Sequence, residues 1–478
     1  MIQDKITEYF EAHRDEMMAR LAALCTIPSV QGAPEEGKPF GREVDAALEA
    51  AAAMFREEGF ETERDPEGRF YLAHFGTGAR TVGIFAHADV VPAGEDWSFT
   101  APFVPVRRDG LLVARGAEDN KAGIIAALYL LKAVRELALP LDVRLVAFIG
   151  GNEETGMEDV EAFCRSYPAP DLSLVPDNDA PLSLGEKGRT EGWLVSPPLL
   201  SDILDISGGR AYNVVLDRAT ATLAYSEGLL SSLEGLVAGR DELTLTPKPE
   251  EGIITLEAAG RAAHASHPEG SRNACVILAE TLAASDALSI DERGLMATVA
   301  LYLADPYGGT LGIAGQDGPF GKRTAVSGMV RVRDGRLFLS MDIRYGSATS
   351  WRELGPILEE ILADEEWDFL LGSAHDGFDL GDGDPAVSAL LSAYHRITGE
   401  VEARPYYSGG GTYARCLPRA FSVGLGVPTV GAEARAVLPA GHGGAHGPDE
   451  CLPEDSYLAA LRVLTEYVLT AADVLRNE

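Results

Sequence analysis

The sequence is poor in basic residues and cysteines, and it has no long apolar run. Its 478 residues include 40 Lys and Arg against 74 Asp and Glu, which gives a formal charge of −34. A surface with this much negative charge repels phosphate groups. We therefore expect no nucleic-acid partner and no binding to anionic membranes. No apolar stretch approaches the roughly 18 residues of a membrane span. The polar, periodic N-terminus also differs from a signal peptide.

The five cysteines exclude most cysteine-based frameworks. They form no CxxC pair and their number is odd, which favours reduced thiols and a cytoplasmic location; they are Cys25, Cys164, Cys275, Cys416 and Cys451. Hydrophobic residues make up 46% and charged residues 24% of the chain, which is typical of a globular protein with a sizeable core.

The first part of the chain alternates helical and strand patterns. Apolar periodicity predicts helices over residues 3–25, 46–58 and 121–136. Short β-branched runs predict buried strands over residues 81–86, 143–149 and 172–175. This order predicts the α/β class, with a mixed, mostly parallel sheet.

The pattern changes after Gly188, where alternating strands such as ITLEAAG and LFLSMDIRY join helices such as residues 274–287. The α/β style returns near Pro385, with a strand at FSVGLGV and a last helix over residues 454–476. We therefore expect a sheet domain interrupted by a large α+β domain. The expected segments are 1–188 and 385–478 for the sheet domain and 189–384 for the insertion.

Polar residues follow several of the predicted strands. His87 and Asp89 follow the first, Glu153 and Glu154 the second, and Asp177 the third. Ligands bind at the carboxyl ends of strands in open α/β sheets, so these side chains are expected at one edge. Two more candidates are Asp119, just before the strong helix, and His446, near the C-terminus.

Each residue has a plainer interpretation when taken alone. A single histidine after a strand is commonly just hydrogen-bonded, a Glu-Glu pair commonly lies on a solvated face, and Asp119 could cap its helix. The need for a soluble surface does not readily explain why three separate strand ends all carry such groups. Histidine and carboxylates together are a typical metal-site composition.

The charges suit two divalent ions. Asp119, Glu154 and Asp177 supply three negative charges, and His87 and His446 add neutral nitrogens. Paired ions need a bridging carboxylate, for which Asp119 is the natural candidate.

The neighbours of these ligands have expected roles of their own. Glu153 lies beside Glu154 and could act as general base toward a metal-bound water. Asp89, two residues after His87, could orient the imidazole.

Five sequence motifs occur in order along the chain: HADVVP (87–92), GAEDNKAG (116–123), GGNEETG (150–156), VPDND (175–179) and GEKG (185–188). They resemble the family of aminoacylases, carboxypeptidases and dipeptidases in the zinc aminopeptidase-like clan. The nearest resemblance is to PepV-type, carnosinase-like bacterial dipeptidases, and it spans nearly the whole chain. It implies His87, Asp119, Glu154, Asp177 and His446 as ligands, Asp119 bridging, Glu153 as base and Asp89 as support for His87.

The resemblance also assigns residues in the inserted region. GRAAHASHPEG implies His264 as a donor to the carbonyl oxygen in the transition state, with His267 as polar surface. The motif RAYNVV implies that Asn213 lies near the substrate. The motif MDIRYG implies that Arg344 binds the substrate carboxylate as a clamp. Without the motif, an arginine in a strand would be read as a surface ion pair. GGGTYAR implies that backbone amides at Gly410 and Gly411 meet the same carboxylate, although a glycine run otherwise indicates only a tight turn.

The sequence departs from the family pattern at a few positions. His442 lies four residues before His446 and is a rival ligand, and Asp179 is a rival to Asp177. Ala122 stands where many relatives have glycine, which leaves Asp119 unaffected.

The long insertion resembles the enlarged lid of PepV-type enzymes, which imitates a dimer within one chain. We therefore expect a monomer that hydrolyses small dipeptides with a free C-terminal carboxylate. Two divalent ions are expected, zinc first, with manganese and cobalt as alternatives. The rival hypotheses are an N-acyl-amino-acid amidohydrolase with the same site, and a metal-dependent binding protein without activity.

Overall fold

The computed structural model describes residues 2–198 and 200–478. The chain forms two compact units. The first unit consists of Met1–Gly185, Leu380–Tyr406 and Thr412–Glu478, and the inserted unit of Glu186–Asp379 and Tyr407–Gly411. The short segment Tyr407–Gly411 thus belongs with the insertion, whereas the sequence pattern placed it in segment 385–478.

The first unit is built on a six-stranded sheet with the order β1-β2-β6-β3-β7-β20. Its strands are β1 (Glu61–Arg64), β2 (Phe70–Phe75), β3 (Thr81–His87), β6 (Arg144–Gly150), β7 (Leu172–Asn178) and β20 (Ala420–Gly424). β6, β3, β7 and β20 run parallel, while β2 is antiparallel to β6 and β1 to β2. The mixed, mostly parallel sheet expected from the sequence is confirmed.

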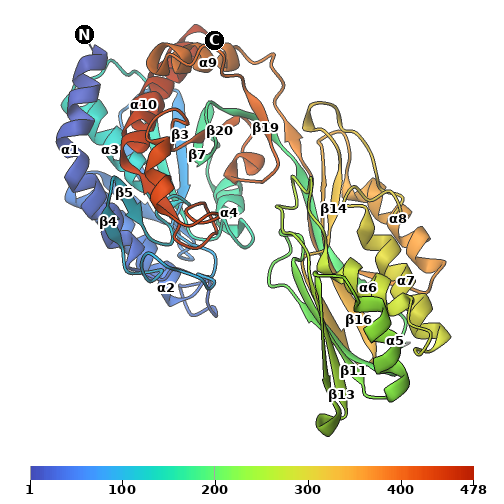
Figure 1. Cartoon of the computed structure of the whole chain (residues 1–478). Helices are drawn as coiled ribbons and strands as arrows, with labels where there is room; N and C mark the ends of the chain where they lie inside the picture. Colours follow the sequence, from blue (N-terminus) through green and yellow to red (C-terminus); the bar gives the residue numbers. More distant parts are fainter. Residues whose placement is uncertain (1, 199) are drawn as a thin grey trace. The chain divides into compact units, whose positions relative to one another are not determined.

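Helices cover both faces of this sheet (Figure 1). They are α1 (Ile2–Cys25), α2 (Arg42–Glu57), α3 (Lys121–Glu136), α4 (Glu158–Ser166), α9 (Pro385–Thr398) and α10 (Glu454–Asn477). Ala86 of β3 faces Gly123 of α3, whereas the neighbouring Phe85 meets Phe163 of α4 edge to face. Because side chains alternate along a strand, His87 at the end of β3 points to the same side as Phe85.

A small antiparallel sheet brings the C-terminal region to the loop before α3. It has the order β21-β5-β4 and consists of β4 (Val106–Arg108), β5 (Leu111–Val113) and β21 (Cys451–Pro453). Cys451 pairs with Val113, and the Ala114 amide donates to the carbonyl of Glu450 at 3.0 Å. This pairing places the segment that carries His446 beside the loop that carries Asp119.

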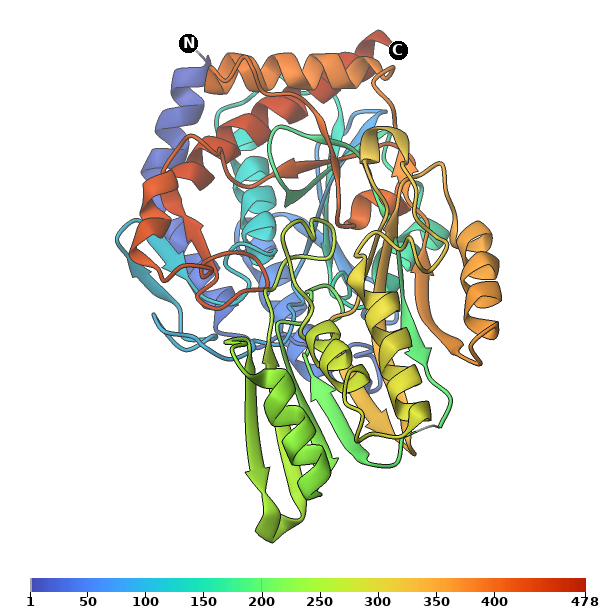
Figure 2. The same ribbon diagram turned by 45° about the vertical axis from the view of Figure 1, so that its right-hand side comes forward.

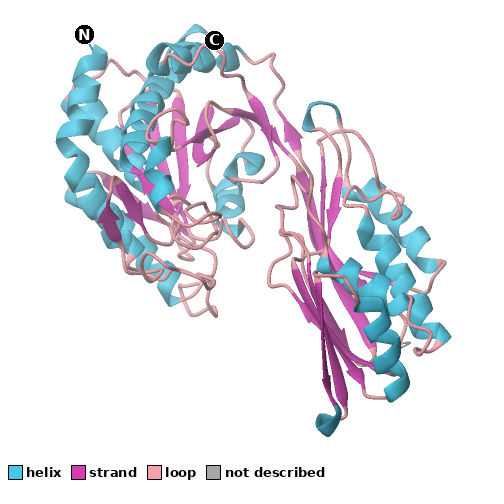
Figure 3. Ribbon diagram, viewed as in Figure 1, coloured by secondary structure: helices cyan, strands magenta, loops and turns pink. Residues whose placement is uncertain are grey.

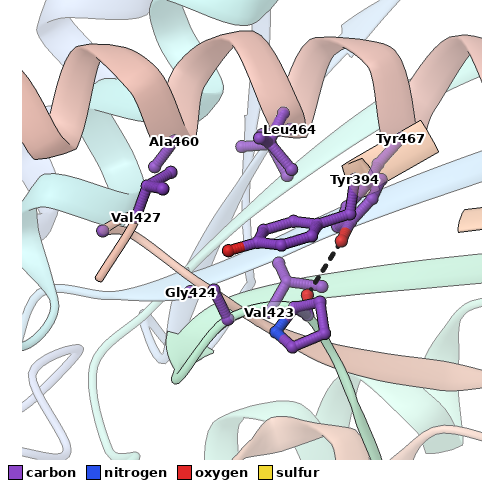
Figure 4. A pocket seen from close by; sticks show the side chains of 11 residues that line it. Tyr394, Val423, Gly424, Val427, Ala460, Leu464 and Tyr467 are labelled. Carbon is purple, nitrogen blue, oxygen red and sulfur yellow. Dashed lines mark hydrogen bonds between the residues drawn. The ribbon is translucent and has the colours of Figure 1, made fainter. Parts of the chain in front are cut away.

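The segment that follows β7 packs against α9, α10 and β20. A small cavity of about 10 Å³ is lined by residues of α9, α10 and β20 and by Ala180 and Pro181. Figure 4 shows the side chains around it. The Tyr467 hydroxyl donates to the carbonyl of Pro181 at 2.9 Å. The tight packing fixes the segment after Asp177.

The inserted unit holds a nine-stranded antiparallel sheet with the order β12-β13-β11-β10-β15-β16-β9-β17, to which β14 adds beside β16. Its strands are β9 (Gly188–Val195), β10 (Ile203–Gly208), β11 (Arg218–Ala224), β12 (Leu243–Lys248), β13 (Ile253–Ala259), β14 (Thr324–Val326), β15 (Val330–Arg333), β16 (Arg336–Tyr345) and β17 (Asp368–His375). Its helices are α5 (Glu227–Val237), α6 (Ala274–Ala283), α7 (Ile290–Ala304) and α8 (Trp351–Ala363).

These helices lie on one face of the inserted sheet (Figure 3), and α5 runs along the β12–β13 hairpin (Figure 2). In β16, Leu339, Met341 and Ile343 enter the core beneath the helices. Asp342 and Arg344 alternate with them and therefore lie on the opposite face. The α+β insertion is as predicted, although α6 ends at Ala283 rather than at residue 287.

No helix within residues 2–198 and 200–478 is long and apolar enough to cross a membrane.

Candidate metal centre

Polar side chains converge where three parallel strands of the first unit end. His87 is the last residue of β3, Glu153 and Glu154 follow β6, and Asp177 lies near the end of β7. Asp119 precedes α3, whose N-cap residue is Asn120, so Asp119 does not cap the helix. Its carboxylate instead turns toward the strand ends.

Two groups of potential ligands share Asp119. His87 Nε2 lies 3.1 Å from Asp119 Oδ1 and 3.5 Å from Asp177 Oδ2. His446 Nε2 lies 2.9 Å from Asp119 Oδ2 and 3.1 Å from Glu154 Oε2. One oxygen of Asp119 therefore faces each group, which is the arrangement that a bridging carboxylate needs between two ions.

Asp89 organises both sides of the centre. The His87 ring places Nδ1 3.0 Å from the Asp89 carbonyl oxygen, so Nδ1 carries the proton and the Nε2 lone pair is free for a ligand. The Asp89 carboxylate accepts hydrogen bonds from the amides of Glu153 and Glu154, at 3.2 and 3.1 Å. Asp89 thus fixes the backbone of the Glu-Glu pair as well as the imidazole.

Glu153 lies beside the two groups without belonging to either. Its Oε2 is 3.9 Å from His87 Nε2. Burial, reinforced by the negative charges of Asp177 and Glu154, raises the pKa of Glu153 well above its ordinary value. Its place beside both ligand groups suits a general base toward a water held there.

The centre carries more negative charge than its own residues can neutralise. Burial and the nearby charge of Asp119 raise the pKa of Asp177 to about 7. Despite burial, hydrogen bonds to Asp119 and Glu154 raise the pKa of His446 to about 11. Glu154 Oε1 is buried and accepts no hydrogen bond from the residues that the structure describes. The donor set of carboxylates and imidazoles, with this unpartnered oxygen, fits divalent cations.

A buried ion pair that the sequence pattern did not reveal holds the Asp119 loop. Glu450 and Arg115 are both fully buried, and Arg115 Nη1 donates to Glu450 Oε2 at 2.6 Å. The Glu450 carboxylate also accepts from the amides of Gly116, Glu118 and Asp119, at 3.1, 2.9 and 3.0 Å. Glu450 therefore sets where Asp119 lies. Glu450 is the last residue of the GAHGPDE segment, but the sequence pattern does not show its pairing with Arg115, which lies far away along the chain.

Two further residues of the site were not predicted from the sequence. The Asn120 side chain donates to Asp177 Oδ1 at 2.8 Å and to the carbonyl of Pro176 at 2.6 Å, which orients the Asp177 carboxylate. The buried Tyr413 ring stands edge-on to the His87 ring, with centroids 6.2 Å apart.

The rival residues occupy other positions. His442 places Nδ1 2.7 Å from Asp449 Oδ2, and its side chain is in neither ligand group. Asp179 is exposed and also lies outside both groups.

The remaining expected site residues lie in the inserted unit. Arg344 is buried, and its Nε and Nη2 donate to the two carboxylate oxygens of Asp342 at 2.8 and 3.1 Å. Arg189, its cross-strand partner, also donates to Asp342, at 3.0 Å. Arg344 Nη1 donates to the carbonyl of Gly409. Arg344 is thus a buried, oriented guanidinium rather than a surface ion pair.

His264 lies next to Asn213 in a paired segment, where the Ala265 amide donates to the Asn213 carbonyl at 2.8 Å. The Ser266 amide donates to His264 Nδ1 at 3.3 Å, so Nδ1 is an acceptor and Nε2 carries the proton. Although His264 is exposed, desolvation by the atoms around its ring and the positive charge of Arg344 lower the pKa of His264 to about 4. A neutral imidazole that presents an N–H is suited to stabilise a developing oxyanion.

The other two expected contacts are glycines beside this cluster. The Gly410 amide donates to Ser408 Oγ at 3.1 Å, and Gly411 follows it in the same half-buried segment. His267 is exposed, and its Nδ1 lies 2.8 Å from Ser266 Oγ. The expected residues therefore gather in two sets, one in each unit.

Comparisons with known proteins agree with the motifs. The chain is 28% identical over 445 residues to the Bacillus subtilis protein named "Putative dipeptidase YtjP", covering 91% of this chain and 92% of that protein. It is 27% identical over 446 residues to a protein of Staphylococcus epidermidis named "Putative dipeptidase", covering 89% and 92%.

Solved structures share the fold. Human carnosine dipeptidase 1 matches with a TM-score of 0.58 at 16% identity, covering 98% of this chain and 100% of that one. The dipeptidase Dug1p of Saccharomyces cerevisiae matches with a TM-score of 0.60 at 14% identity, covering 98% of both.

The family model for peptidase family M20/M25/M40 matches residues 83–470, a span that includes every residue of both ligand groups. The resemblance drawn from the motifs is thereby confirmed. The chain is a metallopeptidase that belongs to peptidase family M20/M25/M40.

Proposed function

We propose that the chain is a dipeptidase that uses two divalent metal ions to hydrolyse dipeptides with a free C-terminal carboxylate. The observation that carries this proposal is the pair of ligand groups that share Asp119, with Glu153 beside them. Nearly full-length similarity to proteins named as dipeptidases supports the substrate class.

The proposed ligands divide between two ions. His87, Asp119 and Asp177 would hold one, and Asp119, Glu154 and His446 the other. Bound ions of this kind polarise a carbonyl and lower the pKa of water. Zinc is the expected metal, with manganese and cobalt as alternatives, because imidazole and carboxylate ligands accommodate all three.

Glu153 is the proposed general base. Its carboxylate takes a proton from the attacking water and returns it to the nitrogen of the leaving amine, so that the peptide bond breaks without free charge on nitrogen. Asp89 supports this step by holding the amides of Glu153 and Glu154.

The inserted unit supplies the proposed substrate contacts. The Nε2–H of His264 donates to the oxygen of the scissile carbonyl as negative charge develops. Arg344 binds the substrate carboxylate, assisted by Asn213 and by the amides of Gly410 and Gly411. We propose that the enzyme works as a cytoplasmic monomer, which light scattering of the purified protein would test for its oligomeric state.

A substrate panel tests the proposal. Metal-stripped protein is resupplied with zinc, manganese or cobalt and assayed on free dipeptides, including β-alanyl-histidine, and on N-acetyl and N-succinyl amino acids. The proposal expects hydrolysis of free dipeptides only. Hydrolysis confined to acylated substrates would assign the same site to an amidohydrolase, and inactivity with every metal would favour a binding protein.

A further inference from the structure

A cavity of about 620 Å³ opens beside the candidate metal centre, within the first unit. Asp119 and Asp177 line it, so it begins at the centre itself. Its volume lies in the range of ordinary ligand pockets. The sequence pattern assigns no role to this space.

Part of the cavity lining forms an apolar wall. Leu425, Val427, Pro428 and Val430, which follow β20, line it together with Leu452. Behind this wall lies the small cavity of Figure 4, which also borders Val427 and has room for about one water molecule. The apolar wall is therefore tightly packed against the residues behind it, which fixes its shape.

One ion pair interrupts the apolar lining. Arg435 Nη2 donates to the carboxylate of Glu118, and both residues line the cavity. Arg435 is the one cation among the described residues of the lining, and its Nε is buried without a hydrogen-bond partner among them. Asp179 adds a further carboxylate.

We propose that this cavity receives the amino-terminal residue of the dipeptide, and that Glu118, Arg435 and Asp179 make it disfavour an acidic side chain. This inference rests on the proposed function, in which the scissile carbonyl lies at the metal centre and the C-terminal carboxylate is held by the inserted unit. Because Asp119 and Asp177 line the cavity, it is continuous with the centre, and a dipeptide whose carbonyl lies there can extend its amino-terminal residue into it.

The selectivity follows from charge. Glu118 and Arg435 neutralise each other, so an apolar side chain meets aliphatic carbon and a balanced pair. An acidic side chain would meet Glu118 and Asp179, which outnumber Arg435, the one cation among the described residues of the lining. Like charges brought together in a partly desolvated site cost binding energy. The wild-type enzyme should therefore prefer leucyl-alanine to aspartyl-alanine.

Reciprocal charge substitutions test this inference. Glu118→Gln leaves Arg435 unpaired and should raise the ratio of kcat/KM for aspartyl-alanine over leucyl-alanine by about tenfold. Arg435→Gln leaves Glu118 unpaired and should raise the ratio for lysyl-alanine over leucyl-alanine by a similar factor. Ratios between substrates cancel any general loss of metal or activity.

Two further variants complete the design. Glu433→Gln removes an exposed carboxylate two residues from Arg435 and outside the cavity lining, so both ratios should stay unchanged. Val430→Phe narrows the cavity and should reduce hydrolysis of leucyl-alanine more than that of glycyl-alanine.

The outcomes are distinguishable. Reciprocal shifts support the inference. Unchanged ratios in both charge variants, with wild-type dipeptide hydrolysis intact, would overturn the inference and leave the proposed function in place. Absence of wild-type hydrolysis on all free dipeptides with every metal would overturn the proposed function and the inference together.

Discussion

The two units of the molecule treat buried charge in opposite ways. In the first unit, four carboxylates meet two histidines at the strand ends. In the inserted unit, Asp342 is matched by the guanidinium groups of Arg189 and Arg344. The first arrangement is incomplete without added cations, whereas the second is complete as folded. The contrast separates a centre whose ligands suit metal ions from a buried cluster that orients polar donors.

The largest effect is expected for the base in the first unit. Glu153→Ala should lower kcat by about 10²–10⁴-fold, because a positioned general base contributes that much. Metal content should stay unchanged, since Glu153 lies outside both ligand groups. Steady-state kinetics and elemental analysis measure the two quantities. Glu161→Ala, on the exposed side of α4, is the control, and near-normal turnover of Glu153→Ala would remove Glu153 as base.

The balanced charges of the inserted unit should govern substrate binding. Arg344→Ala should raise KM for free dipeptides by about 10–100-fold, because hydrogen bonds to charged groups contribute about 1.5–3 kcal/mol. Amidated dipeptides lack the carboxylate and should be affected little. Arg344→Lys keeps the charge but loses the planar fork, so it should restore KM only in part. An equal loss on free and amidated substrates would contradict the clamp.

The anchor of the Asp119 loop gives a more moderate test. Glu450→Gln weakens the acceptor for Arg115 and three backbone amides, so Asp119 should be less well held. Metal affinity should fall about 10–100-fold, as is typical when a residue that positions a ligand is changed. Calorimetric titration measures the affinity, with the exposed Glu402→Gln as control. Unaltered affinity in a folded Glu450→Gln protein would show that the loop keeps its place without this anchor.

The smallest effect concerns the histidine of the inserted unit. The pKa of His264 is lowered to about 4, below the ordinary value of 6.5, so its neutral form persists as the pH falls through 6 and 5. NMR titration of the imidazole, assigned by comparison with His264→Gln, should place its midpoint below pH 5. A midpoint near 6.5 would mean that desolvation and the charge of Arg344 do not act on the ring as described.

The sequence predicted those parts of the fold that depend on local pattern. Strands β3, β6 and β7 are short apolar runs, and the polar residues after them fall at one sheet edge because parallel strands end together. The local pattern alone is therefore enough to predict that His87, Glu153, Glu154 and Asp177 lie close together. Asp119 and His446 were also candidates before the family motifs were considered, although a loop and a distant segment carry them, and the motifs imply the same roles.

The remainder depends on contacts that no local pattern encodes. Glu450 reaches the Asp119 loop through the pairing of β21 with β5, and Tyr413 reaches His87 from a segment far along the chain. The membership of Tyr407–Gly411 in the inserted unit is set by the same kind of long-range packing. Arg344 was assigned as a clamp, but its close pairing with Asp342 comes from their i, i+2 spacing on one strand.

The central claim is that Asp119 joins two ion sites in the first unit. Metal-stripped protein should be titrated with zinc and its bound ions counted, for the wild type, Asp119→Asn, His446→Ala and His442→Ala. The account predicts two ions for the wild type and for His442→Ala, one for His446→Ala, and loss of tight binding at both sites for Asp119→Asn. Two tightly held ions in Asp119→Asn, or an ion lost from His442→Ala rather than from His446→Ala, would contradict it.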